Sequence, residues 1–136
     1  MSTATLEKTW SLGDEAPVKV FGPISRTDIV RYQGASGDFH PLHHDEPFAK
    51  KVGFPSIFSV GMLQAGLLST FATDWLGVEN IRKFNVRFEE VVWPGDELTC
   101  TGKVTAVENG VIKVELTMTR QTGGVALSGS AESLTA

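Results

Sequence analysis

The chain has 136 residues, a single cysteine and a formal net charge of -4, with acidic and basic side chains interspersed along its length. This length suits one domain with a sizeable hydrophobic core. Because the sequence has no Lys/Arg cluster, it lacks the electrostatic footprint of a nucleic-acid-binding protein, and we expect no nucleic-acid partner.

The cysteine and the apolar segments place limits on the environment of the protein. Cys100 has no second cysteine to pair with, and the N-terminus has no signal-peptide pattern, so we expect a cytoplasmic protein. The most apolar stretch, Gly61 to Leu76, is short and interrupted by polar residues. A bilayer-spanning helix needs about 20 apolar residues, so we expect no membrane association.

The N-terminal part of the chain predicts a tail, a strand and a helix. Residues 1–15 are polar and read as a tail with apolar anchors at Leu6, Trp10 and Leu12, and we expect a single domain over residues 16–136. Val18 to Ile24 is predicted to form a short strand. Ser25 is a suitable N-cap for a helix from Arg26 to about Ala35, with Asp28 near its positive end.

The middle of the chain predicts a long irregular segment and then a buried helix. Gly37 to Pro55 contains Pro41 and Pro47, so we expect turns with at most one short helix near Pro47 to Lys51. Gly61 to Leu76 carries apolar residues around nearly the whole helical circumference. A helix of this kind is predicted to be buried on all sides.

The remainder of the chain predicts antiparallel strands. Residues 84–88, 98–106, 112–118 and 125–134 read as strands, with apolar and polar residues alternating in the first three. Asn109-Gly110 and Gly123-Gly124 predict hairpin turns. One buried helix followed by such a sheet indicates an α+β domain in which the sheet wraps around the helix.

Asp38 and His43 are candidates for acid–base chemistry. Adding water across a double bond conjugated to a thioester needs a base for the water, an acid for the adjacent carbon and donors for the enolate oxygen. A fully extended chain from Asp38 to His43 would span roughly 17 Å. The two side chains can therefore share one water only if the segment curls, which Gly37 permits.

Gly61 is a candidate for the enolate donor. It begins the predicted buried helix, where backbone N–H groups lack helical partners and the helix dipole is positive. Because glycine has no Cβ, a thioester could approach the backbone closely. Three nearby apolar residues could form the wall of a dry acyl pocket: Phe54, Ile57 and Phe58.

The segment from Tyr32 to Ala49, which contains Ser-Gly-Asp38-Phe-His-Pro-Leu-His43, resembles the signature of the MaoC-like dehydratase, or (R)-specific enoyl-CoA hydratase, family. The resemblance extends to Gly61-Met62-Leu63, Asn85 to Phe88 and Pro94-Gly95-Asp96. It implies a hot-dog fold and paired chains whose sheets join, as a homodimer, a higher oligomer or a heterodimer with a paralogous chain. It also implies Asp38 and His43 as the catalytic pair and the Gly61 N–H as the donor to the thioester carbonyl.

The reaction implied by the resemblance is the reversible hydration of a 2-enoyl thioester to the (R)-3-hydroxyacyl form. No cofactor is implied beyond coenzyme A or acyl carrier protein as the carrier of the substrate. His40, Val60 and Met62 are expected to line the substrate site. The family usually has Asn at the position of His40 and commonly His at that of Val60, and His40 could replace an Asn hydrogen bond.

Other interpretations of the same residues stay open. Asp38 and His43 could be a loop cap and an exposed histidine, and Gly61 could mark close packing of helix and sheet. His40, His43, His44 and Asp45 could bind a metal, although Pro41 disfavours the helix that would align them. Alternative functions are an acyl-CoA thioesterase and a non-catalytic acyl-binding subunit of a heteromeric dehydratase.

Overall fold

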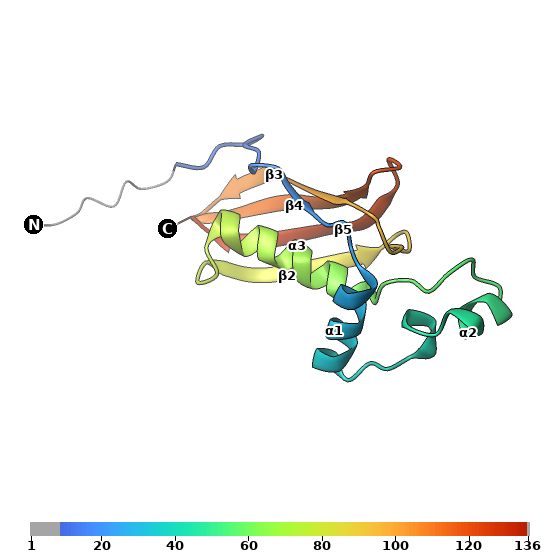
Figure 1. The fold of residues 1–136 in the computed structure, drawn as a ribbon. Coiled ribbons are helices and arrows are strands. Elements are labelled where there is room, and N and C mark those ends of the chain that lie inside the picture. Colours follow the sequence, from blue (N-terminus) through green and yellow to red (C-terminus); the bar gives the residue numbers. More distant parts are fainter. Residues whose placement is uncertain (1–8, 136) are drawn as a thin grey trace, which may run out of the picture.

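The computed structural model describes residues 9–135, which form one antiparallel sheet with a long helix across one face (Figure 1). The helix is α3 (Gly61–Leu76), and the strands are β1 (Lys19–Phe21), β2 (Ile81–Phe88), β3 (Leu98–Glu108), β4 (Val111–Arg120) and β5 (Val125–Leu134). The strand order is β1-β3-β4-β5-β2, and all neighbours are antiparallel. The predicted α+β architecture is confirmed.

The turns between the last three strands follow from their sequences. Asn109 and Gly110 both have positive φ, 51° and 77°, which is the requirement of a tight two-residue hairpin. Alternate residues of β3 and β4 face α3 and form the core, Cys100 among them with no exposed surface. Burial raises the pKa of the Cys100 thiol to about 12, so this cysteine stays neutral and inert.

One prediction about α3 is wrong, because the helix is not buried on all sides. Its core face contacts the sheet through Leu68, Phe71 and Ala72, whereas Met62 is 57 % exposed and Thr70 is also exposed. Residues four apart lie on one helical face, and a single-layer sheet covers only the opposite face. No helix in the described part of the chain is long and apolar enough to cross a membrane.

β1 and β2 differ from their predicted bounds, and β3 and β4 extend at most two residues beyond theirs. β1 is shorter than Val18 to Ile24, because Pro23 has no N–H to donate to a ladder. β2 is longer than predicted and begins at Ile81. Its last residue, Phe88, is 53 % exposed although the alternation would turn it towards the core.

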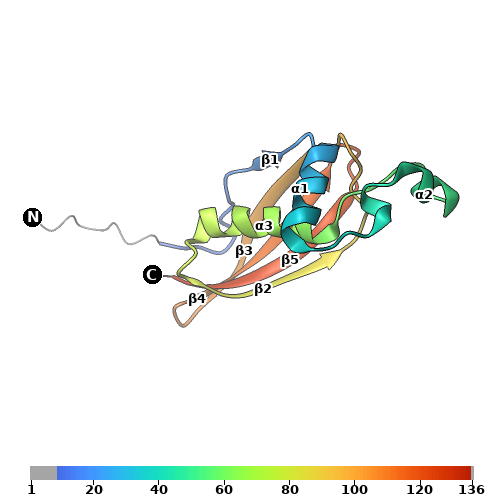
Figure 2. The same cartoon turned by 60° about the horizontal axis from the view of Figure 1, so that its bottom comes forward.

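Residues 24–60, here called the lobe, connect β1 to α3, and the part of the lobe around Glu46–Lys51 projects beyond one end of the sheet (Figure 2). The lobe contains α1 (Arg26–Ser36), the short 3-10 turn η1 (Pro41–His43) and α2 (Glu46–Lys51). Ser25 and Asp28 cap α1 reciprocally, each backbone N–H donating to the other side chain at 2.9 Å. The predicted cap is therefore confirmed, and η1 is an element that the sequence did not predict.

Part of the predicted N-terminal tail is attached to the sheet. The Gly13 N–H donates to the Val104 carbonyl at 2.9 Å, and the Val104 N–H donates to the Asp14 carbonyl at 2.8 Å. The rings of Trp10 and Trp75 meet edge to face at 5.7 Å between centroids. Residues 1–8, Leu6 among them, lie outside the described residues.

Candidate active site

The segment from Asp38 to His43 is curled by hydrogen bonds among its own residues. The His40 N–H donates to Asp38 Oδ1 at 3.2 Å, and the Leu42 N–H donates to His40 Nδ1 at 3.1 Å. The His40 and His43 rings lie 6.0 Å apart between centroids. Asp38 is exposed and His43 is half-buried. The segment is therefore compact, as a water shared by Asp38 and His43 requires, and His40 supplies an acceptor as the Asn oxygen would.

The orientation and tautomer of His43 follow from one hydrogen bond. Its Nδ1 lies 2.7 Å from the carbonyl oxygen of Phe58, and its ring meets the Phe58 ring at right angles, 5.2 Å between centroids. A carbonyl oxygen can only accept, so Nδ1 must carry the hydrogen. The neutral ring then has its free lone pair on Nε2, which can take a proton.

Gln33 holds the backbone on either side of Phe39. This side chain comes from α1, is 2 % exposed, and its Nε2 donates to the carbonyls of Asp38 at 2.9 Å and His40 at 3.2 Å. Its Oε1 lies 3.2 Å from His44 Nδ1. Gln33 was not among the predicted site residues, although a signal was available, since Gln33 follows Ile29 by four residues and shares its helical face.

The predicted substrate-contacting residues are only partly accessible. Phe54 and Phe58 are half-buried and pack together at 5.0 Å between ring centroids, and His40 and Met62 are exposed. Ile57 and Val60, in contrast, are 1 % and 4 % exposed. Both side chains belong to the hydrophobic core, and their contact with an acyl group stays a prediction.

Gly61 begins α3, and its surroundings bear on both interpretations of this glycine. Val60 is the N-cap and its side chain caps none of the first-turn N–H groups; the Leu63 N–H donates to the Val60 carbonyl at 2.9 Å, and the Gly61 N–H lies at the positive helix end. A Cβ on Gly61 would lie 2.9 Å from Phe88 Cε1. Close packing thus favours glycine here whether or not the N–H binds a ligand.

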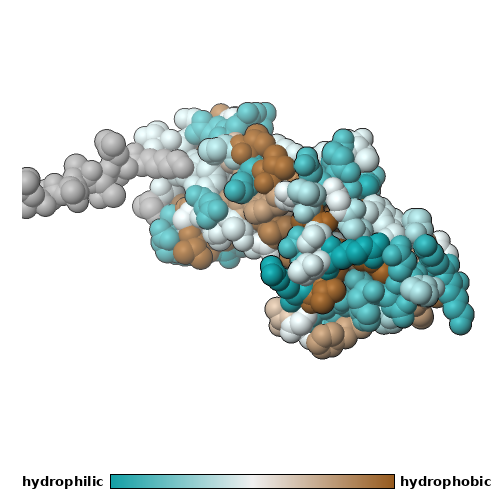
Figure 3. Space-filling model, viewed as in Figure 1, coloured by the Kyte–Doolittle hydropathy of each residue, from teal (hydrophilic) through white to brown (hydrophobic). Residues whose placement is uncertain are grey.

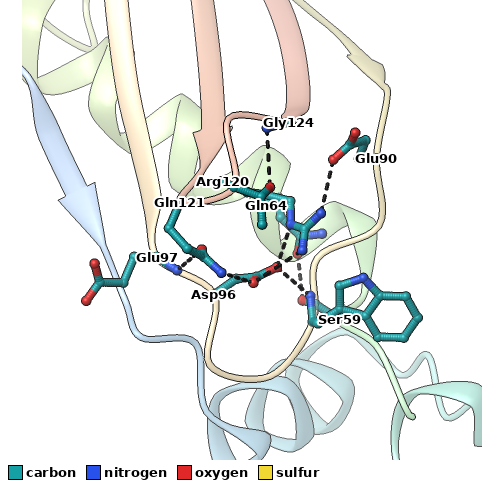
Figure 4. A network of polar contacts seen from close by, with 10 residues as sticks. Ser59, Gln64, Glu90, Asp96, Glu97, Arg120, Gln121 and Gly124 are labelled. Carbon is teal, nitrogen blue, oxygen red and sulfur yellow. Dashed lines mark hydrogen bonds and ion pairs between the residues drawn. The ribbon is translucent and has the colours of Figure 1, made fainter. Parts of the chain in front are cut away.

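A buried polar network fixes the loop between β2 and β3 (Figure 4). Asp96 is 3 % exposed and accepts hydrogen bonds from Arg120 Nε at 2.7 Å, Gln121 Nε2 at 2.6 Å and the Trp93 N–H at 2.9 Å. Burial alone would raise the pKa of Asp96, but these hydrogen bonds outweigh it and lower the pKa. Arg120 also pairs with Glu90 at 3.0 Å, so it ties both ends of the loop.

This fixed loop supports the lobe at three points. The Gly95 N–H donates to the Ile24 carbonyl at 2.7 Å, and the Ile24 N–H donates to the Asp96 carbonyl at 2.9 Å. The Ser59 N–H donates to the Val92 carbonyl at 2.8 Å. The Trp93 ring meets the ring of Phe58, whose carbonyl holds His43, at 5.9 Å between centroids. The sequence indicated a turn at Pro94-Gly95-Asp96 but not its buried carboxylate.

The histidines of the lobe face separate partners. Within residues 9–135, no group of three His, Cys, Asp or Glu side chains is arranged to hold a metal ion. The Nδ1 atoms of His40, His43 and His44 contact Leu42, Phe58 and Gln33 respectively. The metal interpretation therefore has no geometric support in the described part of the chain.

An apolar cavity of about 510 Å³ lies where α1, α3 and the end of β1 meet. Its lining includes Leu63 and Leu67 of α3, Phe21 and Ile24 before α1, and Tyr32 on α1. Figure 3 shows apolar side chains gathered on this side of the molecule, over β1 and α3. The volume is within the range of small-molecule sites, and the cavity begins within one helical turn of Gly61.

The strand order and the helix held across the sheet define the hot-dog fold, here with a lobe that carries a carboxylate and a tautomerically fixed imidazole. Residues 8–124 match the family described as MaoC like domain, and the chain belongs to this family.

Relatives of this chain include hydratases. It is 33% identical over 100 residues to the beta subunit of 3-oxo-4,17-pregnadiene-20-carboxyl-CoA hydratase from Mycobacterium tuberculosis, covering 73% of this chain and 76% of that subunit. It is 34% identical over 99 residues to the peroxisomal hydratase-dehydrogenase-epimerase of Saccharomyces cerevisiae, covering 73% of this chain but only 10% of that protein.

Solved structures share the fold over nearly the whole chain. The ChsH1-ChsH2 complex from Mycobacterium tuberculosis matches with a TM-score of 0.83 at 28% identity, covering 93% of this chain and 98% of that one. An (R)-hydratase from A. caviae matches with a TM-score of 0.81 at 24% identity, covering the same shares, which shows the fold alone. The chain is thus a MaoC-like hot-dog protein with hydratases among its relatives.

Proposed function

We propose that this chain catalyses the reversible addition of water to a 2-enoyl thioester, giving the (R)-3-hydroxyacyl thioester. The observation that carries the proposal is the hydrogen bond from His43 Nδ1 to the Phe58 carbonyl at 2.7 Å. It leaves Nε2 as a free base beside the curled segment that bears Asp38. The substrate would be carried on coenzyme A or acyl carrier protein, and the reaction needs no further cofactor.

In the hydration direction, Asp38 and His43 Nε2 hold one water. As the water oxygen bonds to C3 of the enoyl group, its proton passes to this pair, and the C2–C3 π electrons move towards the thioester oxygen. The Gly61 N–H and the positive end of α3 stabilise the enolate that forms. C2 then takes a proton from the pair, so the water is consumed and the pair is restored.

The acyl group has two apolar surfaces next to the proposed thioester position. The half-buried pair Phe54 and Phe58 lies on the His43 side, and the cavity of about 510 Å³ begins at Leu63, close to Gly61. We assign the cavity to the acyl chain because its lining is largely apolar. A comparison of a short and a long enoyl substrate tests this assignment. The longer acyl chain would fill the cavity, so the longer substrate should have the lower KM.

The test of the proposed reaction follows the loss of the enoyl-thioester absorbance. Asp38→Asn and His43→Ala should each lower kcat by about two orders of magnitude or more, the usual size of general acid–base catalysis. Asp74→Asn, an exposed carboxylate near the far end of α3, is the matched control and should have no effect. Unchanged rates in both site variants would refute the assignment, and release of free thiol would indicate a thioesterase.

We further propose that β2 pairs with a second hot-dog chain, either a copy of this one or a paralogue. β2 is at the edge of the sheet and pairs only with β5 among the described strands. An exposed edge strand with apolar residues such as Phe88 favours pairing with another chain. Similarity to a hydratase beta subunit supports the heteromeric form. Light scattering of the purified chain should give a dimer or larger; a monomer that also fails to turn over would favour the heteromer.

A further inference from the structure

Gln33 is the point where the lobe's rigid helix meets its exposed catalytic segment. The amide is almost fully buried and uses both its nitrogen and its oxygen, whereas Asp38, Phe39 and His40 are all exposed. Exposed residues are not held by packing, so their position depends on hydrogen bonds. The two Gln33 donors bracket Phe39 and fix the backbone from which the Asp38 carboxylate projects.

The orientation of this amide is itself determined. The two backbone carbonyls can only accept, so the face of Gln33 towards them must be its NH₂ group. His44 Nδ1 lies 3.2 Å from the remaining oxygen and donates to it. A flipped amide would place oxygen against two carbonyls and nitrogen against an N–H, which makes the observed orientation the favourable one.

Gln33 is also connected to the stable part of the lobe. It lies four residues after Ile29, which has no exposed surface, and before Gly37, which ends α1 with a φ of 78°. The N-terminus of the same helix follows Ile24, which hydrogen bonds to the fixed loop between β2 and β3. The position of α1 is therefore transmitted to the segment of Asp38 by the Gln33 side chain, in addition to the chain itself and the Asp38 N–H, which donates to Ser36 Oγ at 3.2 Å.

We propose that Gln33 is a positioning residue for Asp38 in the hydration reaction. This inference rests on the proposed function, because Asp38 must act on the water for its position to matter. Loss of the two hydrogen bonds leaves two exposed carbonyls that water can solvate, so the fold should persist. The carboxylate, however, loses its fixed place relative to His43 Nε2, and misplacement by about 1 Å can lower a rate about 100-fold.

The experiment is a double-mutant cycle between Gln33→Met and Asp38→Asn, with kcat, KM and the thermal midpoint measured for each variant. Gln33→Met should lower kcat by about 10-fold to 100-fold and change KM much less. In the Asp38→Asn background the same substitution should lower kcat no further, because Gln33 then has no carboxylate to position. General destabilisation would instead lower the active fraction in both backgrounds.

Two further variants keep the result clear. Gln33→Glu retains the size and the acceptor for His44 but removes the donor. It takes the place of Gln33→Met if that variant folds poorly, and it should lower kcat in the same way. Asn80→Leu is the matched control, because the Asn80 amide likewise donates to a backbone carbonyl, that of Leu76 at 2.9 Å, at the far end of α3. It should leave kcat unchanged.

Three results would overturn the inference: wild-type kcat in both folded Gln33 variants, equal losses in both backgrounds, or a loss confined to KM. If Asp38→Asn alone has wild-type kcat, the proposed function fails instead. The two failures are therefore distinguishable within one set of variants.

Discussion

Replacing Gly61 by alanine tests why α3 begins with glycine. A Cβ would meet Phe88 Cε1 at 2.9 Å and Cδ1 at 3.1 Å, whereas carbon atoms prefer about 3.5–4.0 Å. Gly61 is not among the residues with positive φ, so alanine meets no backbone strain. The cost of Gly61→Ala should therefore come from one contact, that with the Phe88 ring.

The magnitude follows from the freedom of that ring. Overpacking costs typically about 1–3 kcal/mol, and because Phe88 is 53 % exposed the ring can turn outward, which favours the lower end. We expect Gly61→Ala to lower the free energy of unfolding by about 1 kcal/mol. In a Phe88→Leu background the same change should not lower the free energy of unfolding, because the clash is absent and alanine has the better helix propensity.

Urea unfolding, monitored by tryptophan fluorescence, measures the change in free energy of unfolding in both backgrounds. Equal destabilisation in the two backgrounds would refute the reasoning, because the clash would then lie elsewhere. Activity adds a second result, since alanine retains the backbone N–H that we assign to the thioester. Because the alanine Cβ also stands where the thioester would approach, the double variant should regain stability but not the activity that Gly61→Ala loses.

Three further predictions concern single residues. Asp96→Asn should lower the free energy of unfolding by about 3 kcal/mol near neutral pH. The folded-state pKa of Asp96 is lowered, so its contribution to stability is complete above the unfolded pKa of about 3.9 and is lost as pH falls through the folded value. In urea titrations, the difference in free energy of unfolding between wild type and variant should therefore shrink in acid. Cys100, whose pKa is raised to about 12, should resist a thiol reagent at pH 8 until urea unfolds the chain. His40→Asn should keep wild-type kcat because an amide oxygen can accept the Leu42 N–H, whereas His40→Ala should lower kcat.

Local signals account for the parts of the fold that were predicted correctly. The Ser25 cap depends on residues within one turn, and the Asn109-Gly110 hairpin on two adjacent residues with positive φ. The error at α3 has a different origin. Met62 and Thr70 share a face, but only the tertiary arrangement decides that the sheet covers the opposite face.

The candidate site was predictable as a set of residues but not as a set of contacts. The motif indicated Asp38 and His43, yet the carbonyl that fixes the tautomer of His43 belongs to Phe58, 15 positions along the chain. The buried pair of Asp96 and Arg120 joins residues 24 positions apart. Periodicity describes one element at a time, and these contacts join different elements.

The hydrogen bonds of Ile24 join segments that are synthesised at different times. The lobe leaves the ribosome before the Gly95 and Asp96 groups that hold Ile24, and Arg120, which holds Asp96, is made later still. α1 can form early with its own cap, but the support for His43 must wait for β4. A nascent chain that ends before Arg120 would thus carry every candidate catalytic residue without the framework that orients them.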